Sequence, residues 1–227
     1  MIGNDIHKLA KQLWPYNRSL TGQGVIDTLH QISNHLPNLN IKSIKSGTKV
    51  FDWVIPKEWE VHEAYIVTPK GKKICDFSKN NLHLIGYSIP FKGTLSLKEL
   101  KKNLYTLPKQ PKAIPYITSY YKERWGFCLS QEQFDTLDDG LYKIVISSTL
   151  SDGKMNYGEL FIKGKSDKEI FLTTYICHHS MANNELSGPT VVTFLAKWLQ
   201  MVDQLEYSYR IVFIPETIGS IAYLSQN

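Results

Sequence analysis

Residues 169–189 read EIFLTTYICHHSMANNELSGP, and this segment is the clearest indication of the fold class. Its first part, Glu169–Cys177, is a nearly continuous apolar run, which is typical of a strand buried inside a parallel sheet. A polar segment follows, and the pattern of Pro189–Met201 then indicates a helix with proline in its first turn. The stretch therefore predicts a strand, a short loop and a helix, which is the repeating unit of an α/β protein.

A second buried strand is expected after this helix. Residues Tyr207–Ile214 are mostly apolar, and Pro215-Glu216-Thr217-Ile218-Gly219 follows them directly and leads into a further helix. Ligand sites in open α/β sheets lie beyond the carboxyl ends of the strands. His178 and Glu216 each follow such a strand end, so the sequence favours a catalytic or metal-binding layout at one edge of the sheet.

The first part of the chain also alternates helix and strand patterns. Apolar spacing predicts a helix over residues 4–15, with Asn4 or Asp5 as its cap, and a second helix capped by Thr21. Two strands, joined by Ser46-Gly47-Thr48, are then expected at Ile41–Ile44 and Val50–Ile55.

From about Pro56 the pattern changes to short strand-like segments separated by proline and glycine. One helix is predicted at Ser96–Leu104, where Ser96 and Glu99 have capping-box spacing. We therefore predict an α/β core made of residues 1–56 and 148–227, interrupted by a small β-rich α+β domain at 57–147. Strands are expected there at Ala64–Thr68, Lys73–Phe77, Leu82–Tyr87 and Tyr142–Ser148, and a short helix near Glu132–Leu137.

Composition excludes several classes of protein. The chain has 227 residues, 42% of them hydrophobic and 21% charged, as in an ordinary soluble globular protein. No run approaches the ~20 apolar residues of a membrane helix, and the N-terminus lacks the pattern of a signal peptide. We therefore expect a cytoplasmic protein without a membrane partner.

The net charge is +5, and lysines concentrate in Lys92–Lys112. No recognition motif accompanies them, so a solvated surface is favoured over a nucleic-acid interface, and no nucleic-acid partner is expected. Cys75, Cys128 and Cys177 are few, odd in number and set in apolar sequence, which indicates buried free thiols.

Each polar residue at the strand ends has a functional and a structural interpretation. His178 is either a metal ligand or a loop histidine bonded to backbone, and His179 is expected to face solvent or to lie behind the metal-facing side chains. Asn184 either faces the same crevice or caps the helix, and Glu185 could simply pair with a surface lysine. Glu216 is either a general base or a carboxylate that stabilises the next helix terminus.

Several motifs occur together in one order along the chain. They are Arg18–Gly22 (RSLTG), Ser46–Trp53 (SGTKVFDW), Pro56–Trp59 (PKEW), Asn81–Ser88 (NLHLIGYS), Ile114–Tyr121 (IPYITSYY), Trp125–Leu129 (WGFCL), Cys177–Pro189 and Pro215–Ser220 (PETIGS). On these motifs the chain resembles the aminopeptidase-like zinc hydrolase family often found in bacterial surface-polysaccharide gene clusters, over the N-terminal half of those proteins.

The resemblance implies a phosphorylase/hydrolase-like zinc-peptidase core, with a mixed sheet flanked by helices and an inserted domain of unknown function. It places His178 at the strand-end zinc ligand, Asn184 at an Asp that binds or bridges metal, and Glu216 at the general base. The implied activity is hydrolysis of a peptide or an amide-bearing substrate linked to surface-sugar synthesis.

The chain departs from the family pattern at specific positions. His178-His179-Ser180 stands where the family usually has His-Pro-Ser, and Asn183-Asn184-Glu185 stands where it has Asn-Asp-Asn. An amide is a poorer zinc ligand than a carboxylate. Thr217 occupies the position of a second Glu that follows the base in two-metal enzymes, so one zinc ion at most is expected.

The resembled proteins continue for about as many residues again, with further strands and another metal-ligand His, so this chain is interpreted as a truncated or incomplete core. Together with Asn184, that supports an alternative function, a non-catalytic relative that recognises a glycan or a protein partner. The aromatic residues of the inserted domain could form such a surface or could be its core. They are Tyr116, Tyr120, Tyr121, Trp125 and Phe127.

Overall fold

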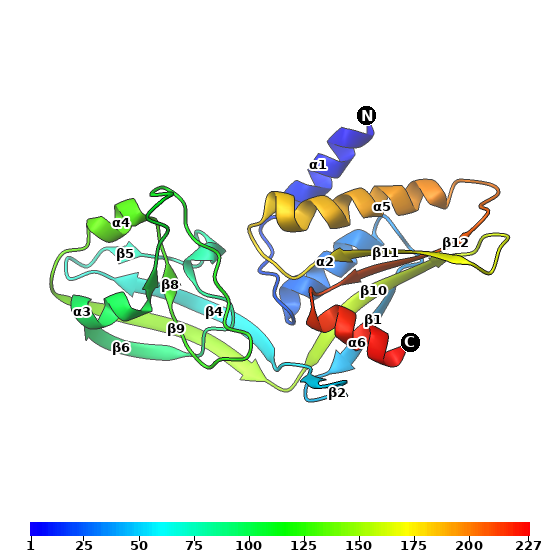
Figure 1. The fold of residues 1–227 in the computed structure, drawn as a ribbon. Helices are drawn as coiled ribbons and strands as arrows, with labels where there is room; N and C mark the ends of the chain where they lie inside the picture. The colour runs from blue at the N-terminus through cyan, green and yellow to red at the C-terminus, as the bar shows by residue number, and fades with distance from the viewer. The chain divides into compact units, whose positions relative to one another are not determined.

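A computed structural model describes residues 1–227, and the chain forms two compact units (Figure 1). The first unit comprises Met1–Glu58 and Asp152–Asn227, and the second comprises Trp59–Ser151. The second unit thus lies between the two segments of the first along the sequence. None of the helices combines the length and apolar character required to cross a bilayer.

The first unit is built on a mixed four-stranded sheet in the order β1-β10-β12-β11. β10 is antiparallel to both β1 and β12, whereas β11 and β12 are parallel. The parallel pair ends with Tyr175 opposite Ile214, so the residues that follow both strands leave the sheet at the same edge. The bounds are β1 Asn40–Lys45, β10 Lys154–Ile162, β11 Glu169–Tyr175 and β12 Ser208–Ile214.

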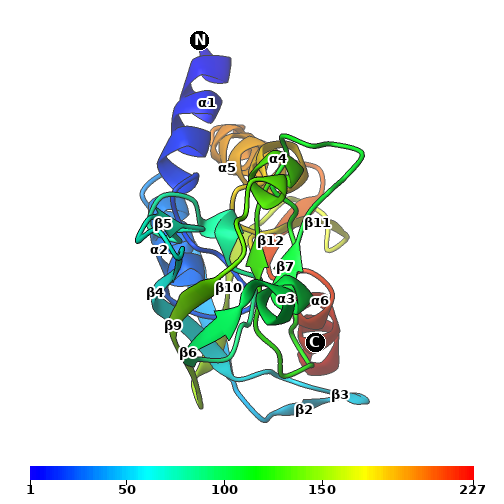
Figure 2. The ribbon, with the colours of Figure 1, turned by 90° about the vertical axis from the view of Figure 1, so that its left-hand side faces the viewer.

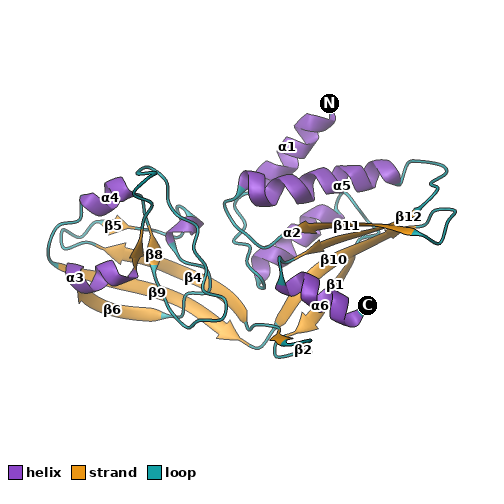
Figure 3. Cartoon of the chain, viewed as in Figure 1, coloured by secondary structure: helices purple, strands orange, loops and turns teal.

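Helices cover both faces of this sheet, which confirms the expected mixed α/β architecture (Figure 3). α2 and α5 lie on one face, and α1 packs on α5 through Leu9, Leu13 and Phe194. α6 lies on the other face, where Tyr223 meets Tyr157 edge to face. The bounds are α1 Ile2–Leu13, α2 Gln23–Ser33, α5 Ser187–Leu199 and α6 Ile218–Gln226, with a π-helix at Ala182–Leu186 directly before α5.

The main core lies between the sheet and the helices α2 and α5. Because side chains alternate along a strand, Leu160 of β10 points into this core while Glu159 and Phe161 point toward the α6 face. The remaining core side chains come from α2, α5 and the central strands. They include Val25, Leu29, Ile32, Ala196, Leu199, Ile211 and Phe213.

The expected caps of the first two helices are wrong. α1 begins at Ile2 rather than after Asn4 or Asp5. α2 begins at Gln23 after Gly22, whose φ of +94° suits glycine because it has no side chain to clash. The hydroxyl of Thr21 instead donates to the carbonyl oxygen of Lys57, at 3.3 Å.

The expected strand Val50–Ile55 is also wrong, because the chain folds back within it. β2 (Lys49–Val50) and β3 (Trp53–Val54) pair as a small hairpin (Figure 2). Phe51 lies at the bend with a φ of +54°. No strand was predicted at β10, although this strand is central to the sheet.

The second unit contains a four-stranded sheet in the order β5-β4-β9-β6 and a short parallel pair, β7-β8. The capping box of Ser96 and Glu99 is confirmed at the start of α3. The strands are β4 Glu58–Val67, β5 Lys73–Ile74, β6 Phe91–Ser96, β7 Leu104–Tyr105, β8 Phe127–Cys128 and β9 Leu141–Ser151. The helices are α3 Leu97–Leu100 and α4 Gln131–Asp135, with 3₁₀ turns at Asn81–His83 and Lys101–Asn103.

Aromatic side chains form much of the interior of this second unit. Trp59 stacks on Tyr87, with ring centroids 5.5 Å apart, and Tyr120 meets Tyr87 edge to face. Trp125 stacks on Phe91, and Phe127 is fully buried, whereas Tyr121 is exposed. The expected strand Leu82–Tyr87 is wrong, because this segment begins as a 3₁₀ turn capped by the side chain of Asn80.

Candidate functional site

The strongest candidate site lies where β11 and β12 end. The N–H of Ile176 donates to the carbonyl oxygen of Ile214 at 3.2 Å, which keeps the two strands paired to their last residues. Beyond that point, His178 Nε2 lies 2.7 Å from Glu216 Oε2. The His178 side chain is 10% exposed and that of Glu216 is 41% exposed, so the pair has a buried member and one open to solvent.

The backbone makes sharp turns shortly after His178 and directly after Glu216. Ser180 has a φ of +53°, and Thr217 has a φ of +58° with a ψ of −80°. A β-branched residue with positive φ is an outlier whose strain the surrounding structure must hold in place. These turns let the chain leave each strand abruptly, so that the side chains just before them converge.

Cys177 lies at the back of the site as a neutral thiol. It is fully buried, and burial raises its pKa well above the ordinary value for a thiol. Its Sγ accepts the backbone N–H of Glu216 at 3.1 Å and lies 3.7 Å from His178 Nδ1. Cys75, Cys128 and Cys177 are all free and buried, as expected from the sequence.

Glu185 comes from the π-helix before α5 and is fully buried. Its Oε1 accepts the backbone N–H of Cys177 and that of His178, the latter at 2.8 Å, while its Oε2 is buried without a hydrogen-bond partner. Burial raises the pKa of this carboxyl, against the opposing effect of His178 and of the two backbone hydrogen bonds. The interpretation of Glu185 as a partner for a surface lysine is therefore wrong.

Arg18 and His179 support the same segment from the other side. Arg18 is buried, and its Nε donates to the carbonyl oxygen of His178 at 3.0 Å. His179 Nδ1 lies 3.1 Å from the carbonyl oxygen of Arg18, and only 2% of His179 is exposed. The expectation that His179 faces solvent is wrong, whereas its expected place behind the reactive side chains agrees with these contacts.

The structure thus brings His178 and Glu216 together, as their positions after two strands predicted. Asn184, the third residue singled out in the sequence, is exposed on the π-helix. Its neighbour Glu185 is the residue that turns toward the strand end. Sequence reasoning missed the burial and bonding of Glu185 and Arg18 and the contact of Cys177 with Glu216, because these depend on which segments pack together.

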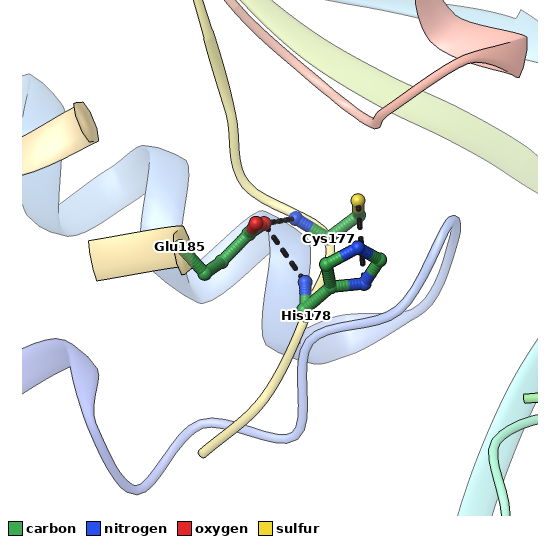
Figure 4. Close-up of side chains that lie close together, drawn as sticks. All are labelled: Cys177, His178 and Glu185. Atoms are coloured by element: carbon green, nitrogen blue, oxygen red, sulfur yellow. Dashed lines mark hydrogen bonds between the residues drawn. The ribbon is translucent and has the colours of Figure 1, made fainter. Parts of the chain in front are cut away.

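One group of side chains has ligand atoms close enough to hold a metal ion, namely Cys177, His178 and Glu185, all within 4.8 Å of one another. Nitrogen, sulfur and oxygen donors all suit zinc. Figure 4 shows, however, the Glu185 carboxylate on one side of the backbone and the sulfur and imidazole on the other. Because Oε1 of that carboxylate already accepts two N–H groups and the donors lie on opposite sides of the backbone (Figure 4), this group does not fit a zinc ion as it stands.

The pair His178 and Glu216 does fit zinc in donor type, since imidazole nitrogen and carboxylate oxygen are both accepted ligands. Their ligand atoms face each other, and the more exposed Glu216 leaves the pair accessible. A catalytic zinc takes about three protein ligands, so the pair alone does not complete such a ligand set.

The fold defines a class, because solved zinc aminopeptidases share it. The chain aligns over its whole length with a zinc aminopeptidase from Bacillus subtilis, with a TM-score of 0.63 at 14% identity, covering 64% of that chain. It aligns over 99% of its length with an M28 peptidase precursor from Shewanella amazonensis, with a TM-score of 0.60 at 11% identity, covering 70% of that chain. At such low identity these likenesses establish the fold alone.

Residues 7–227 match the family model described as Domain of unknown function (DUF4910), and the chain belongs to this family. A relative from Clostridium acetobutylicum is 52% identical over 99% of this chain and 51% of its own length. Its provisional name is polysaccharide biosynthesis protein with aminopeptidase-like domain. The chain therefore spans about half the length of the curated relative it matches.

A crystal structure from the same organism, provisionally described as a peptidase, is also 52% identical. It superposes with a TM-score of 0.96 over 99% of this chain and covers 53% of that one. The chain thus has the fold of an aminopeptidase-like domain, which agrees with the resemblance seen in the sequence motifs.

Proposed function

We propose that this chain belongs to a metal-dependent hydrolase of peptide or amide bonds, with Glu216 as the catalytic base and His178 as a metal ligand. The observation that carries the proposal is the 2.7 Å contact between His178 Nε2 and Glu216 Oε2 at the ends of two parallel strands. The fold shared with zinc aminopeptidases and the name of the Clostridium relative support it.

The different exposure of His178 and Glu216 suits the two roles that we propose for them. His178 is held in a buried position, which fixes its ring, whereas Glu216 can reach solvent and a bound substrate. A carboxylate in that position can take a proton from an attacking water at Oε2 and later give it to the leaving amine. The pair thus supplies the proton transfers that hydrolysis of an amide bond needs.

Zinc would be held through His178, with Asn184 as the amide at the position of the family's metal-binding Asp, and one ion at most is proposed. When bound, zinc would act as a Lewis acid that polarises the carbonyl group of a substrate. Because an amide is a weak ligand, we propose that the site depends mainly on His178.

The proposed substrate is a peptide or an amide-bearing small molecule. The name of the Clostridium relative connects that protein with polysaccharide biosynthesis, and we carry this connection to the present chain as part of the proposal. An amide-bearing intermediate of surface-sugar synthesis would satisfy both the chemistry of the site and this connection.

Replacement of Glu216 by Gln tests the proposed role of the base. Gln keeps the size of the side chain but cannot take a proton, so hydrolysis of amino-acid nitroanilides with added zinc should fall by about 10²- to 10⁴-fold. The substitution Glu206→Gln, which alters an exposed glutamate, serves as the control and should leave the rate unchanged. Full activity in the Glu216 variant would refute its role as the base.

A non-catalytic binding protein is the second candidate function. The exposed amide of Asn184 favours it, and so does a cavity of about 330 Å³ in the second unit, lined by Lys70, Lys72 and Tyr142 among others. That volume lies at the lower end for small-molecule sites. Such a protein would recognise a glycan or a protein partner without turnover.

The substitution Asn184→Asp separates the two candidates. If the site is a metal centre weakened by its amide, the new carboxylate should tighten zinc binding by about tenfold, or about 1.4 kcal/mol. Isothermal titration with zinc, beside Asn183→Asp as a control at the neighbouring exposed position, measures the change. Equal zinc affinity in all three proteins would favour the binding protein.

A further inference from the structure

The peptide groups around His178 are held by side chains from two distant parts of the chain. The carboxylate of Glu185 accepts the N–H groups of Cys177 and His178. The Nε of Arg18 donates to the carbonyl oxygen of His178. The backbone of the histidine is therefore fixed on both its amide and its carbonyl side, by residues that do not belong to the sheet.

This arrangement solves a problem that the strand end creates. Beyond Ile176 the hydrogen bonds to β12 end, so the N–H groups of Cys177 and His178 have no strand to bond, although both residues are buried. Buried N–H groups must find partners elsewhere. One oxygen of the Glu185 carboxylate accepts both N–H groups. This is possible because two consecutive N–H groups that point the same way can share one acceptor.

Glu185 is a costly residue to use for this purpose. Its side chain is fully buried, and a carboxylate is expensive to remove from water even with the charge of Arg18 nearby. Its Oε2 makes no hydrogen bond, so Glu185 does not link the strand end to a wider network of polar side chains. The hydrogen bonds it does make both go to the backbone of Cys177 and His178.

We propose that Glu185 is a positioning residue that sets the orientation of His178 toward Glu216, with Arg18 as the second half of the same clamp. It acts through the backbone of Cys177 and His178 rather than on a substrate. The proposal rests on the proposed function in taking His178 as the reactive histidine, but the clamp can be tested without any turnover.

The route from Glu185 to the reactive atoms is short. Glu185 fixes the backbone of residues 177 and 178, and the ring of His178 then reaches Glu216. The thiol of Cys177 fixes the backbone of Glu216, the second residue of the pair, because its sulfur accepts the N–H of Glu216. In Figure 4 the carboxylate approaches the strand end from the side opposite the imidazole, as a support and not as a fellow ligand.

The experiment compares Glu185→Gln with Glu185→Met in the full chain by long-range ¹H–¹⁵N spectra of the histidine rings. Gln keeps an oxygen that can accept both N–H groups, whereas Met has a similar shape and no acceptor. The chain has seven histidines, so the His178 signals are assigned from their loss in a His178→Gln variant. We expect the His178 signals to stay in place in the Gln variant and to shift or broaden in the Met variant.

Glu159→Met is the matched control, because Glu159 is also a buried, hydrogen-bonded carboxylate of the first unit but lies within β10. It should lower thermal stability without moving the His178 signals. The proposal is overturned if Glu185→Met leaves those signals in place, if Glu185→Gln moves them equally, or if the control moves them as much.

A measurement on the unaltered protein covers the case in which Glu185→Met does not fold. The backbone amide protons of Cys177 and His178 should resonate downfield and exchange slowly with deuterium, because both bind a buried carboxylate. Rapid exchange of these two amides in the folded protein would overturn the clamp directly.

Zinc titration of the same variants separates this proposal from the proposed function. Loss of a residue that orients a ligand histidine weakens metal binding by about 10- to 100-fold, so Glu185→Met should raise the dissociation constant by that factor and Glu185→Gln by less. If the unaltered protein binds no zinc while the histidine signals respond as expected, the proposed function fails and the clamp stands. If zinc binds equally well in all variants and the signals do not respond, the clamp fails and the metal site stands.

Discussion

Thr217 is the residue at which the backbone departs most clearly from ordinary geometry. Its φ of +58° and ψ of −80° are unfavourable for a β-branched side chain, and the side chain itself is exposed. A positive φ costs a non-glycine residue about 1–2 kcal/mol. The strain is stored directly beside Glu216, where the turn out of β12 directs the carboxylate toward His178.

We therefore expect Thr217→Gly to raise the free energy of unfolding by about 1 kcal/mol, because glycine removes the steric cost at little loss of packing. Urea denaturation followed by circular dichroism measures it. Thr217→Ala, which keeps a Cβ atom, should gain less. A glycine variant that is less stable than the unaltered protein would show that the turn is not strained.

At this residue scale the sequence predicted the pair but not its support. His178 and Glu216 each follow a recognisable apolar strand, so their meeting follows from the parallel pairing of those strands. Glu185 could not be predicted, because a polar residue beside two asparagines carries no local sign of burial. Its position depends on the π-helix and on its hydrogen bonds to the residues that follow β11.

A group of charged and aromatic side chains attaches helix α6 to its face of the sheet. The hydroxyl of Tyr223 donates to Glu159 Oε2 at 2.7 Å, and Lys42 Nζ binds Glu159 Oε1 at 2.8 Å. Burial alone would raise the pKa of Glu159, but the hydrogen bonds from Lys42 and Tyr223 and the nearby charge of Arg210 hold it below its ordinary value of 4.5. Burial, followed by the contact with Glu159, raises the pKa of Tyr223 to about 12.

The lowered pKa of Glu159 predicts a pH-dependent contribution to stability. The unfolded state takes up the proton at a higher pH than the folded state, so the stabilisation is complete above pH 4.5 and is lost as pH falls through the lowered pKa. Glu159→Gln should therefore reduce the free energy of unfolding at pH 7 by about 1.5–3 kcal/mol.

Urea denaturation at a series of pH values tests this expectation, with Glu206→Gln at an exposed glutamate as the control. The difference between Glu159→Gln and the unaltered protein should shrink as the pH falls below 4.5 and through the lowered pKa of Glu159. A difference that stays constant over the whole series would show that the charge of Glu159 contributes nothing.

At the scale of elements, patterns of apolar residues predicted most helices and the two parallel strands. The caps of α1 and α2 were not predicted correctly. For α2 the reason is that the hydroxyl of Thr21 donates to the carbonyl oxygen of Lys57, which is far along the chain. β10 was missed although Met155, Tyr157 and Leu160 are buried on it. Its buried polar residues Asn156 and Glu159 interrupt the apolar run that would otherwise indicate a central strand.

At the scale of the whole molecule, the two units each have an interior of their own. The second unit, Trp59–Ser151, contains its own sheet and its own aromatic core. We propose that it is a domain inserted into the aminopeptidase-like core, close to the boundaries expected from the sequence.

A domain with its own core should fold alone. Residues 59–151 produced as a separate polypeptide should therefore unfold cooperatively on heating and give dispersed amide signals in NMR spectra. Trp59→Ala is the control, because it removes the largest fully buried side chain of that core and should cost about 3–5 kcal/mol. A non-cooperative transition of the isolated segment would show that it depends on the rest of the chain.

The measurement that tests the proposed metal site most directly is the zinc content of the purified, tag-free protein by elemental analysis, beside His178→Ala. His178 is the best zinc ligand among the strand-end residues and faces the carboxylate of Glu216. We predict about one zinc ion per chain, lost in the His178 variant while the fold is kept. A well-folded protein without zinc, or equal zinc content in both proteins, would contradict the metal-dependent function.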